Sequence, residues 1–235
     1  MTNTALLPRV RAARWAVVAA WPPELEPLVA TLPPRLREQV LFATVGVGLI
    51  EAAMGTAKLI AEHSPEAILL VGTAGVYPGQ SRQLRLGSAA VIDEMVLLAT
   101  LHPGTSGYLP EIVPTRARSS SALLRALRKT SKLPSADTAC PLAITASSEA
   151  AVAAAHLTGC ALENLEAFAV ARAAASAGIP FAAVLGVANH VGPTGHLEWK
   201  QNGRRAAAAA CDTVLSMLRV PPAAPPSARS RRRRL

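Results

Sequence analysis

Four short segments combine carboxylate, amide or hydroxyl side chains with small residues, and each segment follows a predicted strand. They cover residues 21–24, 72–75, 163–166 and 189–195. In an open α/β sheet the ends of parallel strands meet at one edge, where ligands bind. Carboxylates at such an edge attract a developing positive charge and accept a proton from water, and an amide binds polar ring atoms. The four segments therefore predict one site for a polar small molecule.

Two glutamates, one asparagine and one threonine are the main candidates for chemistry in these segments, and each has a purely structural alternative. Glu24 and Glu166 lie where helices are expected to begin, so both can simply complement a helix dipole. Asn189 ends a strongly apolar strand, and its amide either caps the turn or faces a ligand. Thr73 lies among small residues, which either bring main-chain N–H groups close to a ligand or form a simple strand-to-helix turn. The residues alone leave these alternatives open.

Several other kinds of site are excluded by spacing. The five histidines, at 63, 102, 156, 190 and 196, include no i, i+4 pair and lie near no thiolate, so no metal site is predicted. The glycine pair at 46 and 48 lacks the third glycine of a dinucleotide fingerprint. Neither a GxSxG elbow nor a Walker A loop occurs. We therefore predict no metal and no cofactor.

Apolar runs alternate with helical patterns, which predicts an α/β fold with parallel strands. Strands are expected over residues 15–20, 40–47, 67–71, 87–98, 143–145, 160–163 and 180–188. Helices are expected over residues 24–30, 50–61, 121–128, 147–159, 165–177 and 199–218, and a long loop over 102–114. We divide the chain into an N-terminal extension (1–13), one domain (14–219) and a disordered Pro/Ala/Arg tail (220–235).

Much of the positive charge lies in the C-terminal tail. The net charge is +9, and it falls to +4 without the five arginines at 229 and 231–234. A nucleic-acid-binding face needs Lys and Arg clustered on the fold, so nucleic-acid binding is a minor hypothesis limited to the tail. Three distant cysteines in apolar surroundings indicate buried, reduced thiols. No apolar run reaches the roughly 20 residues of a membrane helix, and we predict a cytoplasmic protein without membrane contact.

Four motifs resemble, in chain order, those of the nucleoside phosphorylase and nucleosidase superfamily. They are a glycine turn at 45–48, a purine-site loop at 71–75, a ribose-binding motif at 163–171, and a strand and loop at 178–192. The resemblance implies a single-domain, three-layer α/β/α fold with a mostly parallel central mixed sheet. It also implies a homo-oligomer in which residues 102–114 contribute near the site.

The resemblance assigns roles to particular side chains. In the hydrolase branch a glutamate after the first strand positions water, and Glu24 holds that place. Glu166 matches the residue that binds the ribose hydroxyls, and Leu165 matches the apolar residue beneath the sugar. Asn189 is the second catalytic candidate, placed at the leaving base. The remaining substrate-binding candidates are Thr73, Ala74, Gly75 and Asn164.

Two features favour hydrolysis of a 6-oxopurine nucleoside. Phosphorylases bring an arginine to the turn after the first strand to hold phosphate, whereas residues 20–24 contain none. Adenine-specific relatives place an aspartate where Asn189 stands, and the two N–H donors of an amide suit N7 and O6 of a 6-oxopurine. These features and Trp199 resemble the futalosine hydrolase branch, which implies hypoxanthine release in menaquinone biosynthesis.

One departure from the family pattern leaves two other functions open. An Arg-Asp pair is expected after residues 191–193, but the sequence has Thr-Gly-His at 194–196. His196 and Glu198 are then the candidates for donating a proton to the leaving base. One alternative function is a phosphorylase that grips phosphate with Arg82, Arg85 or Arg116. The other is a nucleoside-binding protein without catalysis.

Overall fold

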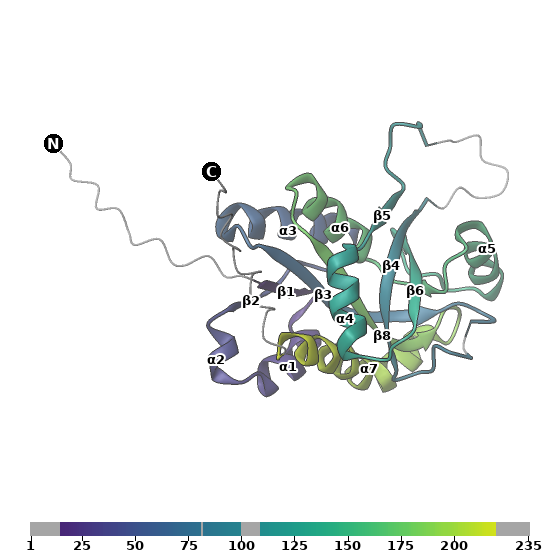
Figure 1. Cartoon of the computed structure of the whole chain (residues 1–235). Coiled ribbons are helices and arrows are strands. Elements are labelled where there is room, and N and C mark those ends of the chain that lie inside the picture. Colours follow the sequence, from purple (N-terminus) through teal and green to yellow (C-terminus); the bar gives the residue numbers. More distant parts are fainter. Residues whose placement is uncertain (1–14, 81, 100–108, 220–235) are drawn as a thin grey trace, which may run out of the picture.

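The structure is a computed structural model that describes residues 15–80, 82–99 and 109–219 (Figure 1). Its strands are β1 (Trp15–Ala19), β2 (Val40–Thr44), β3 (Ala67–Val76), β4 (Ala89–Leu98), β5 (Arg116–Arg118), β6 (Ser135–Pro141), β7 (Leu162–Glu163) and β8 (Phe181–His190). Its helices are α1 (Pro22–Thr31), α2 (Pro34–Arg37), α3 (Leu49–His63), α4 (Ser121–Thr130), α5 (Ser148–Thr158), α6 (Ala167–Ser176) and α7 (Gly195–Leu218). The predicted extension, the predicted tail and residues 102–108 of the predicted loop lie outside the described residues.

The central sheet is mixed and mostly parallel, as predicted. Five of its strand pairings are parallel, and three are antiparallel. β8 pairs with both β3 and β4, while β7 pairs with both β6 and β3. Strands β3, β8, β4, β6 and β7 therefore form a closed ring of hydrogen-bonded neighbours, and β1 and β2 extend from β3.

Two strands pair with the same edge of β3, and the residues between the two pairings have no strand partner on that edge. β1 pairs with residues 67–70 of β3, and β7 pairs with residues 75–76. The intervening residues 71–74 have no strand partner on that edge, although β8 pairs with them on the other edge. Because buried main-chain N–H and C=O groups must find partners, this stretch is where side chains can bind the backbone of β3.

Helices cover both faces of the sheet and give the three layers. Alternate residues of a strand point to opposite faces. Ala16 and Val18 accordingly pack in one core with α3 and α6, whereas Val17 and Ala19 pack in another with α1, α4 and α7 (Figure 1). Burial on both faces explains why β1 is apolar throughout rather than alternating. α7 crosses β8 so closely that a Cβ on Gly186 would lie 2.0 Å from the Ala206 carbonyl oxygen.

The structure corrects several predicted elements. Residues 72–75, predicted as a loop, are the end of β3, and Asn189 lies within β8 rather than after it. The strand predicted at 143–145 is absent, because Pro141 ends β6 just before it and Thr145 is instead held by Glu163. Strands β5 and β6 were not predicted. The last helix begins at Gly195, four residues before the predicted start.

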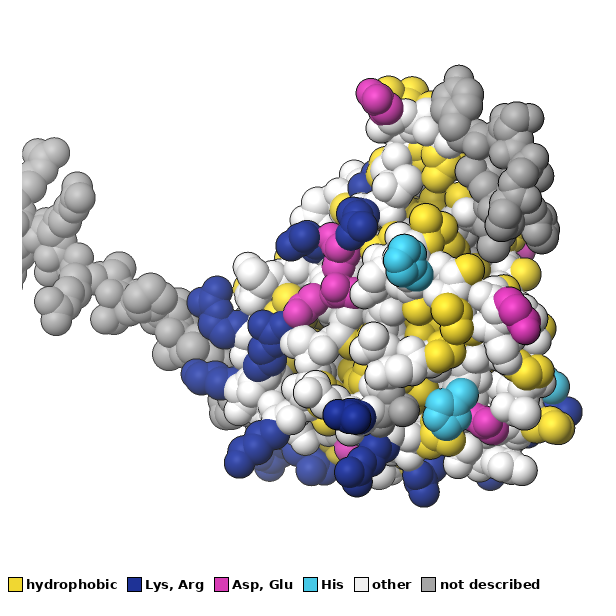
Figure 2. Space-filling view, turned by 90° about the vertical axis from the view of Figure 1, so that its right-hand side faces the viewer, with side chains coloured by type: hydrophobic (Ala, Val, Ile, Leu, Met, Phe, Trp, Pro, Cys, Tyr) yellow, Lys and Arg dark blue, Asp and Glu magenta, His cyan; other side chains and the backbone are white. Residues whose placement is uncertain are grey.

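The surface and the thiols complete the comparison with the sequence. The three cysteines are free and buried, as predicted. Figure 2 shows hydrophobic side chains gathered on the face that carries α5, where exposed apolar residues include Leu142, Ile144, Val152 and Leu157. None of the described helices is both long enough and apolar enough to span a bilayer. The homo-oligomer implied by the resemblance stays a prediction.

Candidate active site

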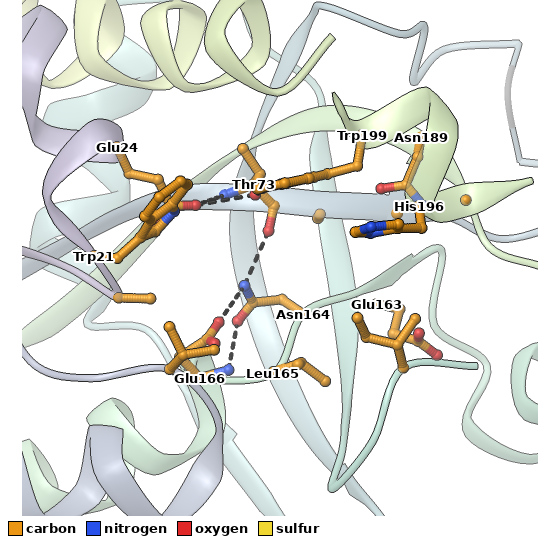
Figure 3. Close-up of a pocket in the computed structure, with 16 residues that line it drawn as sticks. Trp21, Glu24, Thr73, Glu163, Asn164, Leu165, Glu166, Asn189, His196 and Trp199 are labelled. Carbon is orange, nitrogen blue, oxygen red and sulfur yellow. Dashed lines mark hydrogen bonds between the residues drawn. The ribbon is translucent and has the colours of Figure 1, made fainter. Parts of the chain in front are cut away.

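A cavity of about 350 Å³ opens beside the unpaired stretch of β3 (Figure 3). All eight residues predicted from the sequence line it. The complete lining is Ala20, Trp21, Glu24, Val47, Thr73, Ala74, Gly75, Ile144, Glu163, Asn164, Leu165, Glu166, Asn189, Gly195, His196 and Trp199. Its size and its mostly apolar wall with a few converging polar groups are typical of a small-molecule site.

Glu24 lies in the first turn of α1, directly after β1, and is only 6% exposed. Its Oε1 accepts hydrogen bonds from the Thr73 main-chain N–H and from the Thr73 hydroxyl, both at 2.9 Å. Its Oε2 is buried and has no hydrogen-bond partner among the described residues. Burial, and then the nearby Glu166 carboxylate, raise the pKa of Glu24 to about 7. The side chain is therefore poised to exchange a proton near neutral pH.

Asn164 joins the two acidic parts of the site. Its Nδ2 donates to the Thr73 carbonyl at 3.0 Å and to Glu166 Oε2 at 2.9 Å. Its Oδ1 accepts from the main-chain N–H groups of Glu166 and Ala167, which caps α6. All four hydrogen-bonding positions of the amide are thus used within the protein. Asn164 fills the open edge of β3 and holds Glu166 in place.

Glu166 lies between two helix N-termini. It is itself the N-cap residue of α6, and its Oε1 accepts from the Gly48 N–H, at the start of α3, at 2.9 Å. Gly48 has φ +86°, a conformation that favours glycine and that aims this N–H at the carboxylate. Burial raises the pKa of Glu166, while the bonds from Gly48 and Asn164 oppose that rise. The helix ends favour the ionised form of the carboxylate.

Glu163 also reaches the cavity, but its carboxylate is taken up by structural bonds. Oε1 accepts from the Thr145 N–H at 3.0 Å. Oε2 accepts from the Thr145 hydroxyl at 2.6 Å and from the fully buried Tyr77 hydroxyl at 2.8 Å. Glu163 therefore fixes the loop that carries Ile144, which forms part of the cavity wall.

Asn189 is packed between two glycines at the opposite end of the cavity from Glu24 (Figure 3). Its Nδ2 donates to the His190 carbonyl at 2.8 Å. A Cβ on Gly75 would lie 2.9 Å from that Nδ2, and one on Gly195 would lie 3.0 Å from it. One N–H of the amide is thus engaged, and one N–H and Oδ1 remain for a ligand. This corrects the expectation that both N–H groups are free.

An aromatic wall connects the two ends of the cavity. The Trp21 and Trp199 rings lie 5.9 Å apart at 34°, and the His196 ring stacks on Trp199 at 6.2 Å and 8°. Trp199 also donates its indole N–H to the Thr73 hydroxyl at 3.1 Å. Glu198 does not line the cavity, and it binds His190 and Thr194 instead. Of the two proton donors suggested by the sequence, only His196 is at the site.

All four predicted segments contribute to the cavity lining, but one of them comes from an antiparallel strand, which was not predicted. Glu24, Thr73 and Asn189 come from the carboxyl ends of β1, β3 and β8, which are parallel. Segment 163–166 begins at the last residue of β7, which runs antiparallel to β3 and closes the ring. Val47 and Ile144 were not predicted as site residues, and neither Trp21 nor Trp199 was assigned a role, because no local motif marks them. The structural role of Gly48 was also missed, although the glycine turn itself was noted.

The described lining of the cavity offers acidic side chains and no cationic one. Three of the described lining residues are carboxylates, and none is Lys or Arg. Arg116 pairs with Glu94, and Arg82 and Arg85 are exposed outside the lining. A phosphate dianion needs cationic or several N–H partners, so none of the arginines that the sequence offered for phosphate serves this cavity. The site suits a ligand that is neutral or becomes positively charged.

Fold and cavity together define a three-layer α/β protein with a cavity of small-molecule size at the closure of its sheet. A model of the phosphorylase superfamily matches residues 15–219, and the chain belongs to that superfamily. It is 29% identical over 194 residues to a 5′-methylthioadenosine/S-adenosylhomocysteine nucleosidase of Geobacillus thermodenitrificans. The aligned region covers 78% of this chain and 80% of the relative.

Solved structures share the fold at low sequence identity. The 5′-methylthioadenosine/S-adenosylhomocysteine nucleosidase of Neisseria meningitidis, solved with methylthio-immucillin-A, has a TM-score of 0.77 at 19% identity, covering 87% of this chain and 97% of that one. The futalosine hydrolase of Helicobacter pylori has a TM-score of 0.76 at 14% identity, covering 88% of this chain and 97% of that one. These two likenesses establish the three-layer fold.

Proposed function

We propose that the protein hydrolyses the N-glycosidic bond of a purine nucleoside. One observation carries the proposal: a buried glutamate, with one oxygen unpartnered among the described residues and a pKa of about 7, lines a cavity without a described cation. Water is then the nucleophile, because phosphate has no cationic partner among the described lining residues. The similarity to two kinds of nucleosidase supports the same reaction.

In the proposed mechanism Glu24 takes a proton from water through Oε2. The water oxygen bonds to C1′ of the ribose while the C1′–N9 bond breaks and its electrons pass to the purine. The purine then takes a proton from solvent, and Glu24 returns to solvent the proton that it took from the attacking water. The sugar becomes cationic in the transition state, and the carboxylates of Glu24 and Glu166 stabilise that charge. The products are free ribose, with its 5′ substituent, and free base.

The proposed binding mode uses the remaining parts of the cavity. Glu166 has one protein donor on each oxygen, so each oxygen can still accept a hydrogen bond from a ribose hydroxyl. Leu165 lies beneath the sugar. Thr73, Ala74 and Gly75 form the wall along β3, and Asn164 acts indirectly, by holding Glu166 and Thr73 in place.

For the base, we propose a 6-oxopurine such as hypoxanthine, with futalosine as the substrate and menaquinone biosynthesis as the pathway. Asn189 is neutral and keeps one N–H for N7 or O6 of the leaving base. A hydrogen bond there stabilises the negative charge that develops as the base departs.

A specific observation also favours a second candidate, a 6-aminopurine nucleoside such as 5′-methylthioadenosine. Because the His190 carbonyl engages one N–H of Asn189, the amide presents one donor and one acceptor. That pair complements the N7 acceptor and the 6-amino donor of adenine. The curated relative that the chain matches is itself a methylthioadenosine nucleosidase.

The test is to incubate the purified protein with futalosine, inosine and 5′-methylthioadenosine, each with and without phosphate, and to measure free base. We expect base release that is independent of phosphate, and the preferred nucleoside distinguishes the two base classes. Glu24→Gln should abolish release while nucleoside binding is kept, whereas Glu26→Gln, an exposed glutamate of the same helix, should retain activity. Release that requires phosphate would instead indicate a phosphorylase, and binding without release a nucleoside-binding protein.

A further inference from the structure

A chain of hydrogen bonds runs from the aromatic wall to the glutamate that we propose activates water. The Trp199 indole N–H donates to Thr73 Oγ1 at 3.1 Å. Thr73 Oγ1 and the Thr73 N–H both lie 2.9 Å from Oε1 of Glu24. Figure 3 shows Trp199 and Glu24 on either side of Thr73.

The direction of this chain is fixed by chemistry. An indole N–H can only donate, so the Thr73 oxygen must accept from it. The single hydroxyl proton of Thr73 is then free to point at Glu24, where Oε1 accepts it. Without the indole, the same hydroxyl can rotate and accept a hydrogen bond from a protonated Glu24 instead.

The consequence concerns which oxygen of Glu24 exchanges a proton. Oε1 already accepts two hydrogen bonds from Thr73, and these bonds favour the ionised form of that oxygen. Oε2 has no partner among the described residues, and the side chain lines the cavity. Oε2 is therefore the carboxylate oxygen that is left to bind a proton.

We propose that Trp199 is a positioning residue for catalysis: its indole N–H orients the Thr73 hydroxyl toward Oε1 of Glu24, so that Oε2 is the oxygen that takes the proton from water. The role of Glu24 as the general base rests on the proposed function, whereas the effect of Trp199 on the titration of Glu24 does not. The Trp199 indole N–H binds Thr73 and neither Glu24 nor Glu166, so it acts on Glu24 through Thr73.

The surroundings hold the indole in this orientation and limit the other influences on Glu24. Trp199 is half-buried between the Trp21 and His196 rings. The titratable groups that face Glu24 are Glu166 across the cavity and Cys211 from α7, whose thiol donates to the Glu24 carbonyl oxygen. His196 lines the same cavity. Replacing Trp199 by Phe leaves all of these titratable side chains in the protein.

The experiment measures the titration of Glu24 directly. Protein labelled with carbon-13 at the glutamate carboxyl is titrated by NMR, and Glu24→Gln assigns the signal. Trp199→Phe keeps a ring in the stack and removes the donor, and Trp21→Phe is the matched control, because its indole N–H makes no hydrogen bond among the described residues. Thr73→Val and the double variant Thr73→Val/Trp199→Phe complete a double-mutant cycle.

We expect Trp199→Phe to raise the pKa of Glu24 by about half a pH unit or more, because a donor to the ionised form is weakened. The acidic limb of the pH profile of kcat/KM moves by the same amount, so activity at pH 6 falls about threefold or more and recovers at pH 9. Trp21→Phe should leave the NMR titration of Glu24 in place. In the Thr73→Val background Trp199→Phe should cause no further change.

Two results would overturn the proposal. One is a Glu24 titration that is the same in the native protein and in Trp199→Phe. The other is a change that persists in full when Thr73 is already Val, because Trp199 would then act on Glu24 without Thr73. If the native protein hydrolyses no nucleoside, the proposed function fails, but the NMR titration still decides whether Trp199 controls Glu24.

Discussion

Replacing Glu24 by Gln should make the protein more stable at alkaline pH while it removes catalysis. Gln retains an oxygen to accept both donors of Thr73, and it places a neutral amide nitrogen where the unpartnered Oε2 lies. The substitution therefore keeps the shape of the site and removes a buried charge beside Glu166. Functional sites commonly carry such a cost in stability.

The magnitude follows from the pKa. Folding raises the pKa of Glu24 from 4.5 to about 7, so the native state holds the proton more tightly than the unfolded chain does. The native state therefore loses stability as the pH rises from 4.5 through 7, and the loss amounts to about 3 kcal/mol once both forms are ionised. About 2 kcal/mol of that loss falls between pH 5 and pH 8.

The assay is urea unfolding of the native protein and Glu24→Gln at pH 5 and pH 8, followed by circular dichroism. We expect the stability advantage of the variant to grow by about 2 kcal/mol from pH 5 to pH 8. Glu26→Gln, at an exposed position of the same helix, should show no such growth. An advantage of Glu24→Gln that is equal at both pH values would refute the reasoning.

Four further predictions concern the same site. First, kcat/KM should rise tenfold per pH unit below pH 7 and level off above it, because only ionised Glu24 accepts a proton from water; a flat profile would exclude this base. Second, Glu166→Gln should lower kcat/KM about 100-fold in the base-release assay without loss of folding, which circular dichroism would check. Third, Gly75→Ala should raise KM at least tenfold, because its Cβ would lie 2.8 Å from Val191 Cγ2 and 2.9 Å from Asn189 Nδ2; an unchanged KM would mean that Asn189 does not contact the base. Fourth, Glu163→Ala should lower the free energy of unfolding by about 3 kcal/mol, because it strands the buried Tyr77 hydroxyl, whereas Glu149→Ala, at an exposed position of α5, should cost less than about 0.5 kcal/mol.

The sequence was sufficient to predict the layers, most of the strands and the segments that form the cavity. Apolar runs such as β1 have a length and pattern that only a sheet covered on both faces accommodates, and this signal is local. The likeness of four ordered motifs to one family then identified the residues that line the site. These predictions depended on features that are contiguous in the chain.

The parts that the sequence could not predict depend on contacts between distant segments. The closure of the ring depends on β7, which has only two residues and no periodicity of its own. The open edge at Thr73 exists only because β1 and β7 stop short of each other along β3. For the same reason the free oxygen of Glu24 and the engaged amide of Asn189 were not foreseeable from their residue types.

The location of Thr73 and Asn189 within paired strands constrains how such a site can diverge. An added residue in β3 or β8 would shift the register and turn every following side chain to the other face of the sheet, unless it formed a bulge like the one between Ala74 and Gly75. The loop before α5 and the turn before α7 have no ladder to preserve; the loop carries Ile144 of the cavity wall, and the turn leads into Gly195. Changes in segment length, and with them new substrate preferences, should therefore accumulate in those two connections while the strands change only by replacement.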